Sequence, residues 1–348
     1  MEMNINIDEN QSETAWNKFG NNNIENNLKN YKLLEIKDDI KIYQYPNNNY
    51  KSPYNLIYQY YIDELELDDE KNCKIILFIG KTGDGKTTAI NAFFNIIKGI
   101  KLEEKYRLVL IREKDKVKVQ DESQTDGLHL YYIKDKNNNP IIIIDSQGFG
   151  DTRGKRYDEL IKEVFQYAFS KLILHINIIC FVTKSNNPRL DFLTKYIFSF
   201  ATSLFSNDLS KNLVILSTFA DRYTIKNEPL YINSIIKDNF FKEILDKMDK
   251  QWWYAVDSLY LFGKDIKNKL CTYTFKQYSY LYDEKLINSD TKDLKISSEI
   301  IKMRLDIKNK IKDIISLYKN IYNKKQKIKE LENYIKEYEK KLIIQNID

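Results

Sequence analysis

The chain has 348 residues, enough for one large domain or for a domain with appendages. Its 55 Lys and Arg residues against 50 Asp and Glu residues give a formal net charge of +5. That excess is too small for the strongly basic surface typical of nucleic-acid-binding proteins, so we expect no nucleic-acid partner.

The cysteines and the hydropathy of the chain indicate the kind of compartment in which the protein is found. Cys73, Cys180 and Cys271 lie far apart, which predicts buried free thiols in a reducing compartment. Two histidines and no cysteine pair give no support to a zinc site. The N-terminus is polar, and no apolar stretch approaches the roughly 18 residues of a membrane span. We therefore expect a cytoplasmic protein without a transmembrane segment.

Residues 1–53 are predicted to form a polar N-terminal arm. Within it, alternating apolar and polar residues at 40–43 indicate a short strand. The next segment, 54–73, is rich in Tyr, Ile and Leu up to residue 65. It is predicted as a helical lead-in that packs against the main domain.

Residues 74–290 form the predicted main domain, in which apolar strands alternate with helical stretches. The expected strands cover 75–79, 108–111, 128–133, 141–144, 176–182 and 213–216, with a hairpin turn at 137–140. Such alternation favours an α/β fold with a mostly parallel sheet and helices on both faces. Ligands bind at the carboxyl ends of the strands in such folds.

A glycine-rich motif directly follows the first strand of this domain. Residues 80–87 read G-K-T-G-D-G-K-T, the phosphate-binding pattern G-x-x-x-x-G-K-[ST], and a helical stretch ending near Gly99 follows. Glycines let successive N–H groups turn towards phosphates, and the helix N-terminus adds its positive end. Lys86 is predicted to bind the β- and γ-phosphates, and Thr87 to bind Mg²⁺. The other nucleotide-binding residues predicted here are Lys81, Thr82, Gly83, Asp84, Gly85 and Thr88.

Two further motifs follow later strands. Residues 145–148 fit D-x-x-G, in which Asp145 can hold Mg²⁺ through water and the Gly148 N–H can sense the γ-phosphate. Residues 217–221 read S-T-F-A-D, in the place of the guanine motif [NT]-K-x-D. Asp221, after Thr218, can accept hydrogen bonds from two guanine donors that adenine lacks, although an ordinary loop Asp is the alternative. Phe219 replaces the usual Lys and can stack on the base.

The last segment, 291–348, is predicted as a long helix. Residues 296–345 contain no Gly and no Pro, and an apolar residue recurs every seven positions from Ile300 to Leu342. The companion position three residues later holds Met303, Lys310, Leu317, Lys324, Leu331 and Tyr338. This heptad favours a coiled coil with a partner or a second copy, and an amphipathic helix folded back on the main domain is the alternative.

These motifs together resemble the septin and immunity-associated GTPase (paraseptin) branch of the P-loop GTPases. The resembling segments are 80–87, 123–125, 145–154, 184–190, 204–205 and 218–221. The resemblance implies a P-loop NTPase G domain with switch loops that binds GTP or GDP with Mg²⁺. It also implies a switch-I Mg²⁺ ligand at Thr125 and a base-edge contact at Ser258, with a structural role as the alternative for both. Members of this branch pair through their G domains across the nucleotide, which implies an oligomer.

The chain departs from that branch at two positions. Gln147 stands where Pro is usual, and Phe219 where Lys is usual. Small GTPases place a Gln directly after D-x-x-G to orient the attacking water, but here that residue is Phe149, so hydrolysis is expected to be slow. Arg153 is a candidate for stabilising charge on the transferred phosphate, in cis or across a dimer, and a solvated loop Arg is the alternative.

Three functions fit the sequence. The first is a slow GTPase that acts as a switch or assembly protein, with Lys86, Thr125, Gly148 and Arg153 at the γ-phosphate. The second is a module that binds GTP without turnover. The third is a P-loop ATPase or kinase, which predicts adenine preference and an Arg-rich lid that the sequence lacks. The basic stretch 319–329 is interpreted as a solvated helix face, and association with an acidic lipid surface stays open.

Overall fold

The computed structural model describes residues 24, 27–46, 49–54, 56–65, 72–112, 127–149, 155–187, 191–204, 212–227, 229, 231–237, 252–263, 268–289 and 292–345. Contacts within the chain divide it into two compact units, Met1–Ser297 and Ser298–Asp348. The first unit holds the sheets and most of the helices, and the second is helical.

The strands and helices have the following bounds. The strands are β1 (Lys32–Lys37), β2 (Ile40–Gln44), β3 (Asn49–Tyr54), β4 (Ile57–Tyr61), β5 (Lys74–Gly80), β6 (Tyr106–Val109), β7 (Leu128–Lys134), β8 (Pro140–Ser146), β9 (His175–Ile176), β10 (Ile178–Lys184), β11 (Leu213–Thr218), β12 (Trp253–Ala255) and β13 (Lys292–Asp293). The α-helices are α3 (Lys86–Ile97), α4 (Lys155–Lys171), α5 (Phe192–Leu204), α6 (Arg222–Asn227), α7 (Ile232–Lys237), α9 (Lys269–Tyr280) and α10 (Lys295–Gln345). Short 3-10 helices cover Leu28–Asn30 and Ser258–Phe262, and a π-helix covers Leu281–Ile287.

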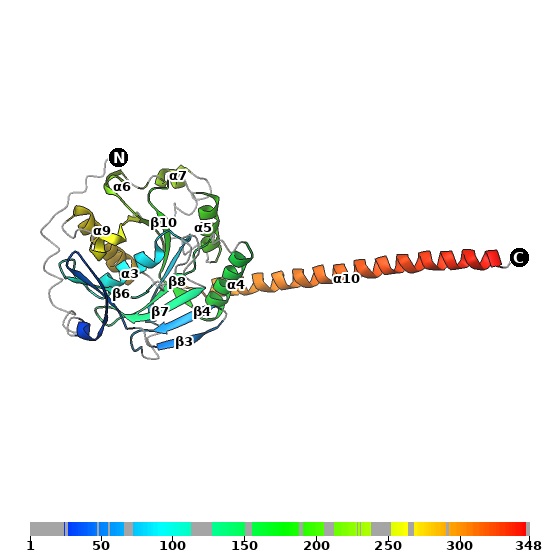
Figure 1. Cartoon of the computed structure of the whole chain (residues 1–348), viewed down its shortest axis with the longest axis horizontal. Coiled ribbons are helices and arrows are strands. Elements are labelled where there is room, and N and C mark those ends of the chain that lie inside the picture. The colour runs from blue at the N-terminus through cyan, green and yellow to red at the C-terminus, as the bar shows by residue number, and fades with distance from the viewer. Residues whose placement is uncertain are drawn as a thin grey trace. The chain divides into compact units, whose positions relative to one another are not determined.

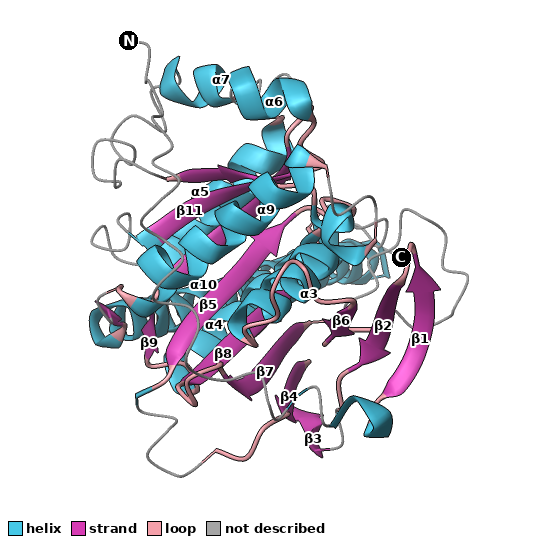
Figure 2. Cartoon of the chain, turned by 90° about the vertical axis from the view of Figure 1, so that its left-hand side faces the viewer, coloured by secondary structure: helices cyan, strands magenta, loops and turns pink. Residues whose placement is uncertain are grey.

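The main sheet has eight strands in the order β12-β11-β10-β5-β8-β7-β4-β3, which can be followed in Figure 2 from β11 to β3. All neighbouring pairs are parallel except the β7–β8 hairpin and the β3–β4 pair. In the predicted turn between β7 and β8, Asn138 takes a left-handed φ of 64°. The predicted mostly parallel sheet and its hairpin are therefore confirmed.

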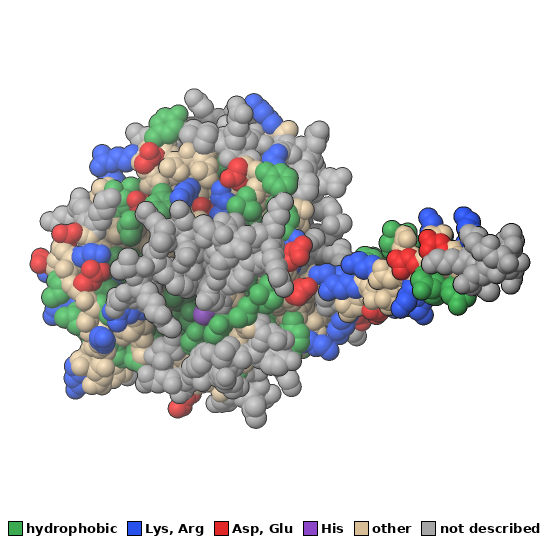
Figure 3. Space-filling view, turned by 45° about the vertical axis from the view of Figure 1, so that its right-hand side comes forward, with side chains coloured by type: hydrophobic (Ala, Val, Ile, Leu, Met, Phe, Trp, Pro, Cys, Tyr) green, Lys and Arg blue, Asp and Glu red, His purple; other side chains and the backbone are tan. Residues whose placement is uncertain are grey.

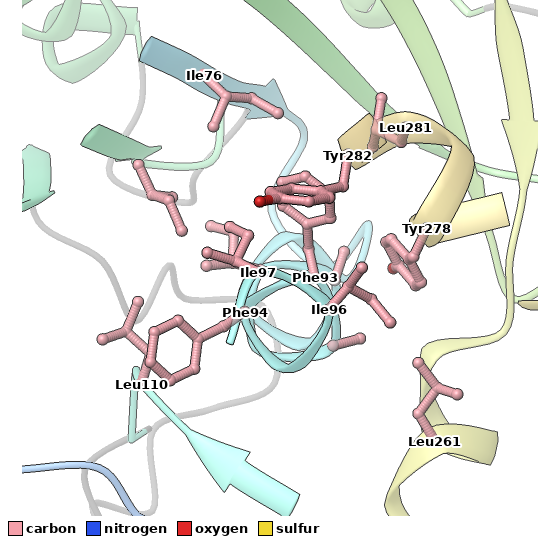
Figure 4. Close-up of a cluster of buried hydrophobic side chains, with 14 of the residues drawn as sticks. Ile76, Phe93, Phe94, Ile96, Ile97, Leu110, Leu261, Tyr278, Leu281 and Tyr282 are labelled. Atoms are coloured by element: carbon pink, nitrogen blue, oxygen red, sulfur yellow. The ribbon is translucent and has the colours of Figure 1, made fainter. Parts of the chain in front are cut away.

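Both faces of the sheet are covered, which explains why its central strand is a continuous apolar run. All residues of β5 from Ile75 to Gly80 are buried. Ile76 and Phe78 belong to the apolar cluster around α3, which Figure 4 shows with side chains from α9 and the π-helix beside it. On the opposite face, aromatic rings of α4 and α5 pack together, as in the Phe165–Phe200 pair at 5.4 Å. The predicted α/β P-loop fold with helices on both faces is confirmed.

The prediction of a helical lead-in over 54–73 is wrong for its first part, because Ile57–Tyr61 forms strand β4. This strand pairs in parallel with β7, and aromatic side chains stack across the pair. Tyr58 stacks on His129 with ring centroids 4.4 Å apart, and Tyr60 on Tyr131 at 4.8 Å. These contacts depend on a strand that lies some 70 residues later in the chain, so the local pattern did not reveal them.

The predicted polar arm also contains folded strands. The predicted short strand is confirmed as β2, which pairs with β1 and with β6 in a separate three-stranded sheet. Ile40 and Ile42 are buried in the cluster around α3. Residues 1–23 lie outside the described residues. The predicted strand at 108–111 begins two residues earlier, at Tyr106, and ends at Val109.

Helix α10 has 51 residues. Figure 1 shows it as one unbroken helix. At 1.5 Å per residue it is about 77 Å long. The predicted long C-terminal helix is therefore confirmed. Among the described helices, none is long and apolar enough to cross a bilayer. The three cysteines of the first unit are buried free thiols, as predicted.

Candidate functional site

Two glycines in left-handed conformations shape the loop between β5 and α3. Gly83 and Gly85 take left-handed φ values of 80° and 81°, and Gly85 is the N-cap of α3. No atom lies within 4 Å of the position that a Cβ at Gly83 would occupy. Thr87 and Thr88, both half-buried, lie in the first turn of α3. The predicted residues of this motif are thus brought together at one helix N-terminus, where an anion is favoured.

Lys86 is held inside this loop. Its ammonium Nζ donates hydrogen bonds to the carbonyl oxygens of Lys81 at 2.9 Å and Gly80 at 3.3 Å. Burial lowers the pKa of Lys86, while the charges of Asp145 and Asp84 act in the opposite direction. The loop therefore carries a positive charge at its centre, bonded to carbonyl groups that a phosphate oxygen can replace.

The D-x-x-G motif packs directly on the same loop. A Cβ added at Gly148 would overlap Thr82 Oγ1 and lie 2.6 Å from Thr82 N, so only glycine fits there. The Thr82 N–H donates to the Phe149 carbonyl oxygen at 3.2 Å, and the Phe149 N–H donates to the Gly80 carbonyl oxygen at 3.3 Å. Asp145 is buried at the end of β8, paired in register with Phe78 of β5. The two predicted motifs therefore form one surface.

Thr82 adds a buried polar atom to this surface. Its Oγ1 is buried and, within the described part of the chain, has no hydrogen-bond partner. A buried hydroxyl without a partner costs free energy, and a bound polar ligand would remove that cost. This atom and the exposed backbone at Gly83 fit a polar ligand such as a phosphate chain.

The segment after β11 reaches the phosphate loop from the other side. Thr218 Oγ1 donates to the Asp84 carbonyl oxygen at 2.7 Å. A Cβ at Gly85 would lie 3.4 Å from the ring of Phe219, which is 43% exposed and has a left-handed φ of 54°. Lys184 Nζ lies 5.7 Å from the centroid of that ring. Phe219 therefore offers one edge to the loop and an exposed part to a ligand.

Asp221 has a structural role in addition to its predicted one. Its Oδ1 accepts hydrogen bonds from the Thr224 N–H at 2.7 Å and from the Thr224 hydroxyl at 2.8 Å. These bonds cap the short helix α6 and hold the pKa of Asp221 below its usual value. Oδ1 is thus occupied, and recognition of guanine would depend mainly on Oδ2.

Ser258 lies close to this segment but turns its hydroxyl away. The Ala220 N–H donates to the Val256 carbonyl oxygen at 3.0 Å, which places the end of β12 beside residues 217–221. Ser258 is buried, and its hydroxyl bonds to the Tyr278 hydroxyl at 2.6 Å. A base contact by the Ser258 side chain would have to replace this bond.

Two residues beside the predicted site, Asp191 and Lys184, were given no role from the sequence. Lys81 Nζ forms an ion pair with Asp191 Oδ2 at 2.8 Å, which ties the loop to the start of α5. Lys184 lies over Phe219 and acts electrostatically on Asp84. Neither partner is near the motif in sequence, so only the sheet order reveals these pairs.

Gln147 connects the D-x-x-G motif to the start of β7. Its Oε1 accepts from the Gly127 N–H at 3.0 Å, and its own N–H donates to the Gly127 carbonyl oxygen at 2.9 Å. Gly127 is two residues after Thr125, but Thr125 and Arg153 themselves lie outside the described residues. Their predicted roles stay predictions.

Comparison with known proteins gives only distant likenesses. No protein-family model matches the chain, and no curated protein matches it. Structures of Toc33 from Arabidopsis thaliana, with Mg²⁺ and GMPPNP or with GDP and Mg²⁺, are similar at 16% identity and a TM-score of 0.41, covering 63% of this chain and 87% of theirs. A structure of chloroplast translocon components atToc33 and psToc159 matches at 16% identity and a TM-score of 0.37, covering 54% and 70%. A bacterial selenocysteine-specific elongation factor, EF-Sec, matches at 13% identity and a TM-score of 0.29, covering 59% and 28%. At such scores we draw nothing about function from them.

Proposed function

We propose that this chain is a GTP-binding protein that binds GTP and GDP with Mg²⁺ in the loop of residues 80–88. The main support for the proposal is the position of Lys86. Its ammonium lies inside a loop whose glycines take left-handed φ values, and Gly148 packs against this loop. This arrangement suits a triphosphate followed by a sensor of its last phosphate. The main domain, residues 74–290, would then be a G domain of the septin and immunity-associated kind.

The protein would supply only a few of the ligands of a magnesium ion in this loop. Thr87 and Asp145, with Thr125 from outside the described residues, would hold the ion together with phosphate oxygens and water. Bound Mg²⁺ would neutralise charge that develops on the phosphates. Among the described residues, no group of three or more His, Cys, Asp and Glu side chains could bind a metal without such help.

The choice of guanine rests on Asp221 and Phe219. The exposed part of the Phe219 ring offers a face for stacking, with Lys184 on the ring as a nearby cation. Asp221 Oδ2 would accept from guanine, while Oδ1 keeps its bonds to Thr224. An adenine base would offer no donor to Asp221 Oδ2.

Hydrolysis in this site would be slow. The residue after D-x-x-G, Phe149, is only 1% exposed, and its ring packs 5.5 Å from that of Phe200. A side chain buried among aromatic rings cannot orient an attacking water. This burial also favours the second candidate, a module that binds GTP without turnover.

The proposed biological role is a nucleotide-controlled switch or assembly protein. Gly148 contacts the phosphate loop, and Gln147 beside it is bonded to Gly127 at the end of the segment that contains Thr125. A γ-phosphate that engages the Gly148 N–H would therefore also act on that segment. Pairing of G domains across the nucleotide is the proposed result, with α10 as a second association surface.

The nucleotide proposal is tested by competition titration of GTP, GDP and ATP in Mg²⁺. The parent chain is expected to prefer GTP over ATP, and Asp221→Asn to lose most of that preference while keeping the cap of α6, because Asn also accepts from the Thr224 N–H. Thr224→Ala is the matched control, which weakens the same cap but keeps the carboxylate and the preference. An unchanged preference in Asp221→Asn would contradict the guanine assignment, and a preference for ATP would favour the ATPase or kinase alternative.

Turnover is tested separately by release of inorganic phosphate. Slow release that Lys86→Ala abolishes supports a GTPase. Binding of GTP without any release supports the module without turnover. Failure to bind any purine triphosphate with Mg²⁺ would overturn the proposal as a whole.

A further inference from the structure

Helix α10 presents a long apolar stripe to solvent in a single chain. Every side chain from 306 to 340 is exposed. The first position of each heptad in this range is an isoleucine, and these side chains are 56–64% exposed: Ile307, Ile314, Ile321, Ile328 and Ile335. Figure 3 shows apolar side chains among charged ones along the described part of α10. Single exposed apolar residues are common on protein surfaces, but a continuous stripe of this length indicates a docking surface.

Two lysines in the stripe restrict how a second copy of the helix can dock. Lys310 and Lys324 occupy the fourth position of their heptads, where Leu317 and Leu331 stand in the neighbouring ones. Lys310 is 71% exposed and bonds to Asp306 at 2.8 Å on its own helix. A parallel pair in register would place each lysine against its own copy, so two like-charge contacts would lie in the seam.

An antiparallel pair avoids both contacts. When two heptad helices run in opposite directions, each fourth-position residue faces a first-position residue of the other helix. Because Lys310 and Lys324 both occupy the fourth position, no antiparallel register brings two of them together. Each would instead extend its apolar stem over an isoleucine and place its ammonium at the edge of the seam.

One antiparallel register gives the greatest overlap of the two helices. Its two-fold axis crosses the seam at the level of Lys319, near the middle of Lys295–Gln345. Leu317 then faces Ile321 of the second copy, Lys310 faces Ile328 and Lys324 faces Ile314. Each lysine is opposite an apolar side chain in this register.

The charges beside the seam agree with the same register. Asp313 faces Lys327 of the second copy, and symmetry repeats this pair on the other side of the axis. Sliding one helix by one heptad would bring Asp313 against Tyr334 or Asn320 of the second copy, depending on the direction, and either slide shortens the overlap. In a parallel pair, Asp313 would face Tyr318 instead, and Lys327 would face Glu332.

We propose that α10 pairs with α10 of a second copy as an antiparallel two-stranded coiled coil whose two-fold axis crosses the seam at the level of Lys319. The apolar side chains at the first and fourth heptad positions would form the seam of this pair. The starts of the two helices lie about 70 Å apart in such a pair. This association needs no nucleotide, so it stands or falls independently of the proposed GTP binding.

A charge-swap series on the full chain, without nucleotide, tests the pairing by sedimentation equilibrium. The parent chain is expected to dimerise, and Asp313→Lys to weaken the dimer about tenfold, because two attractive contacts become repulsive. Adding Lys327→Asp is expected to restore the parent affinity. Glu330→Lys changes the charge equally on the outer side of the helix and is expected to leave the affinity within about twofold. A monomer at all concentrations, or a double variant without rescue, would overturn the proposal.

Spin labels report the orientation directly. The native cysteines are buried, which allows selective labelling of Lys319→Cys or Glu337→Cys in the full chain. The antiparallel pair predicts that the two labels at 319, which are level with the axis on the outer faces of the two helices, are much closer together than the two labels at 337. Residue 337 is level with residue 301 of the second copy, which is 36 residues from that copy's own 337. Labels at 337 are therefore expected about 54 Å apart along the helices. Short distances at both positions would show a parallel pair and overturn the proposal.

Discussion

Asp84 places a carboxyl group inside the loop that we propose binds phosphates. It is 3% exposed, and burial raises its pKa from 3.8 to about 6, against the opposing effects of Lys81, Lys86 and Lys184. Above that pH the group is ionised and adds a negative charge to the loop. The charges of Lys81 and Lys86 in the loop, and of Lys184 at the end of β10, are therefore partly balanced by this carboxylate, and a bound triphosphate would have to compete with it.

The first prediction concerns the pH dependence of stability. Because the pKa of Asp84 is higher in the folded chain than in the unfolded one, the folded state keeps a proton between about pH 4 and pH 6. Stability from this group is therefore present at low pH and lost as the pH rises through about 6. The stability of Asp84→Asn relative to the parent chain is expected to rise by about 2 kcal/mol from roughly pH 4.5 to pH 7. Urea unfolding at both pH values measures it, and a pH-independent difference between the two chains would contradict the assignment.

At the scale of elements, the start of β7 is held in place by a close approach of two backbones. Gly127 has a left-handed φ of 94°, and a Cβ there would overlap the carbonyl oxygen of Leu56 and lie 2.8 Å from its Cβ. The same carbonyl accepts from the Leu128 N–H at 2.9 Å. This junction therefore joins β4 to β7 immediately beside the Gln147 contact.

The second prediction compares two glycine substitutions. Gly127→Ala is expected to destabilise the first unit by about 3 kcal/mol or more, because backbone strain and overlap with Leu56 act together. Gly83→Ala carries similar strain but meets no atom within 4 Å, so a loss of only about 1 kcal/mol is expected. Chemical unfolding without nucleotide measures both. Equal losses would show that the overlap at Leu56 is relieved without cost.

The elements that the sequence predicted correctly are those with a strong local signal. The loop at 80–87 has glycines and a lysine at fixed spacing between a strand and a helix, and α10 repeats its heptad without interruption by Gly or Pro. Strand β4 was missed because I-Y-Q-Y-Y has no clear period, and its identity depends on stacking with His129 and Tyr131. The same limit applies to the site, where the Asp221 cap on Thr224 and the Lys184–Phe219 contact form only after folding.

For the whole molecule, the two compact units imply two separable properties. The residues proposed to bind nucleotide lie within Met1–Ser297, and the apolar stripe of α10 lies within Ser298–Asp348. The packed core around α3 also belongs entirely to the first unit. Stability and nucleotide response should therefore follow the first unit, and nucleotide-independent dimerisation should follow the second.

The third prediction tests this separation with a chain cut after Ser297. Nucleotide at 100 times its dissociation constant stabilises a binding fold by about 2.7 kcal/mol, which corresponds to a rise in melting temperature of roughly 5 to 10 °C for a domain of this size. The shortened chain and the full chain are expected to show the same rise with GTP and Mg²⁺, while only the full chain dimerises without nucleotide. Lys86→Ala in each length is the control and should remove the rise. A shortened chain that folds but no longer responds to GTP would contradict the assignment of nucleotide binding to the first unit alone.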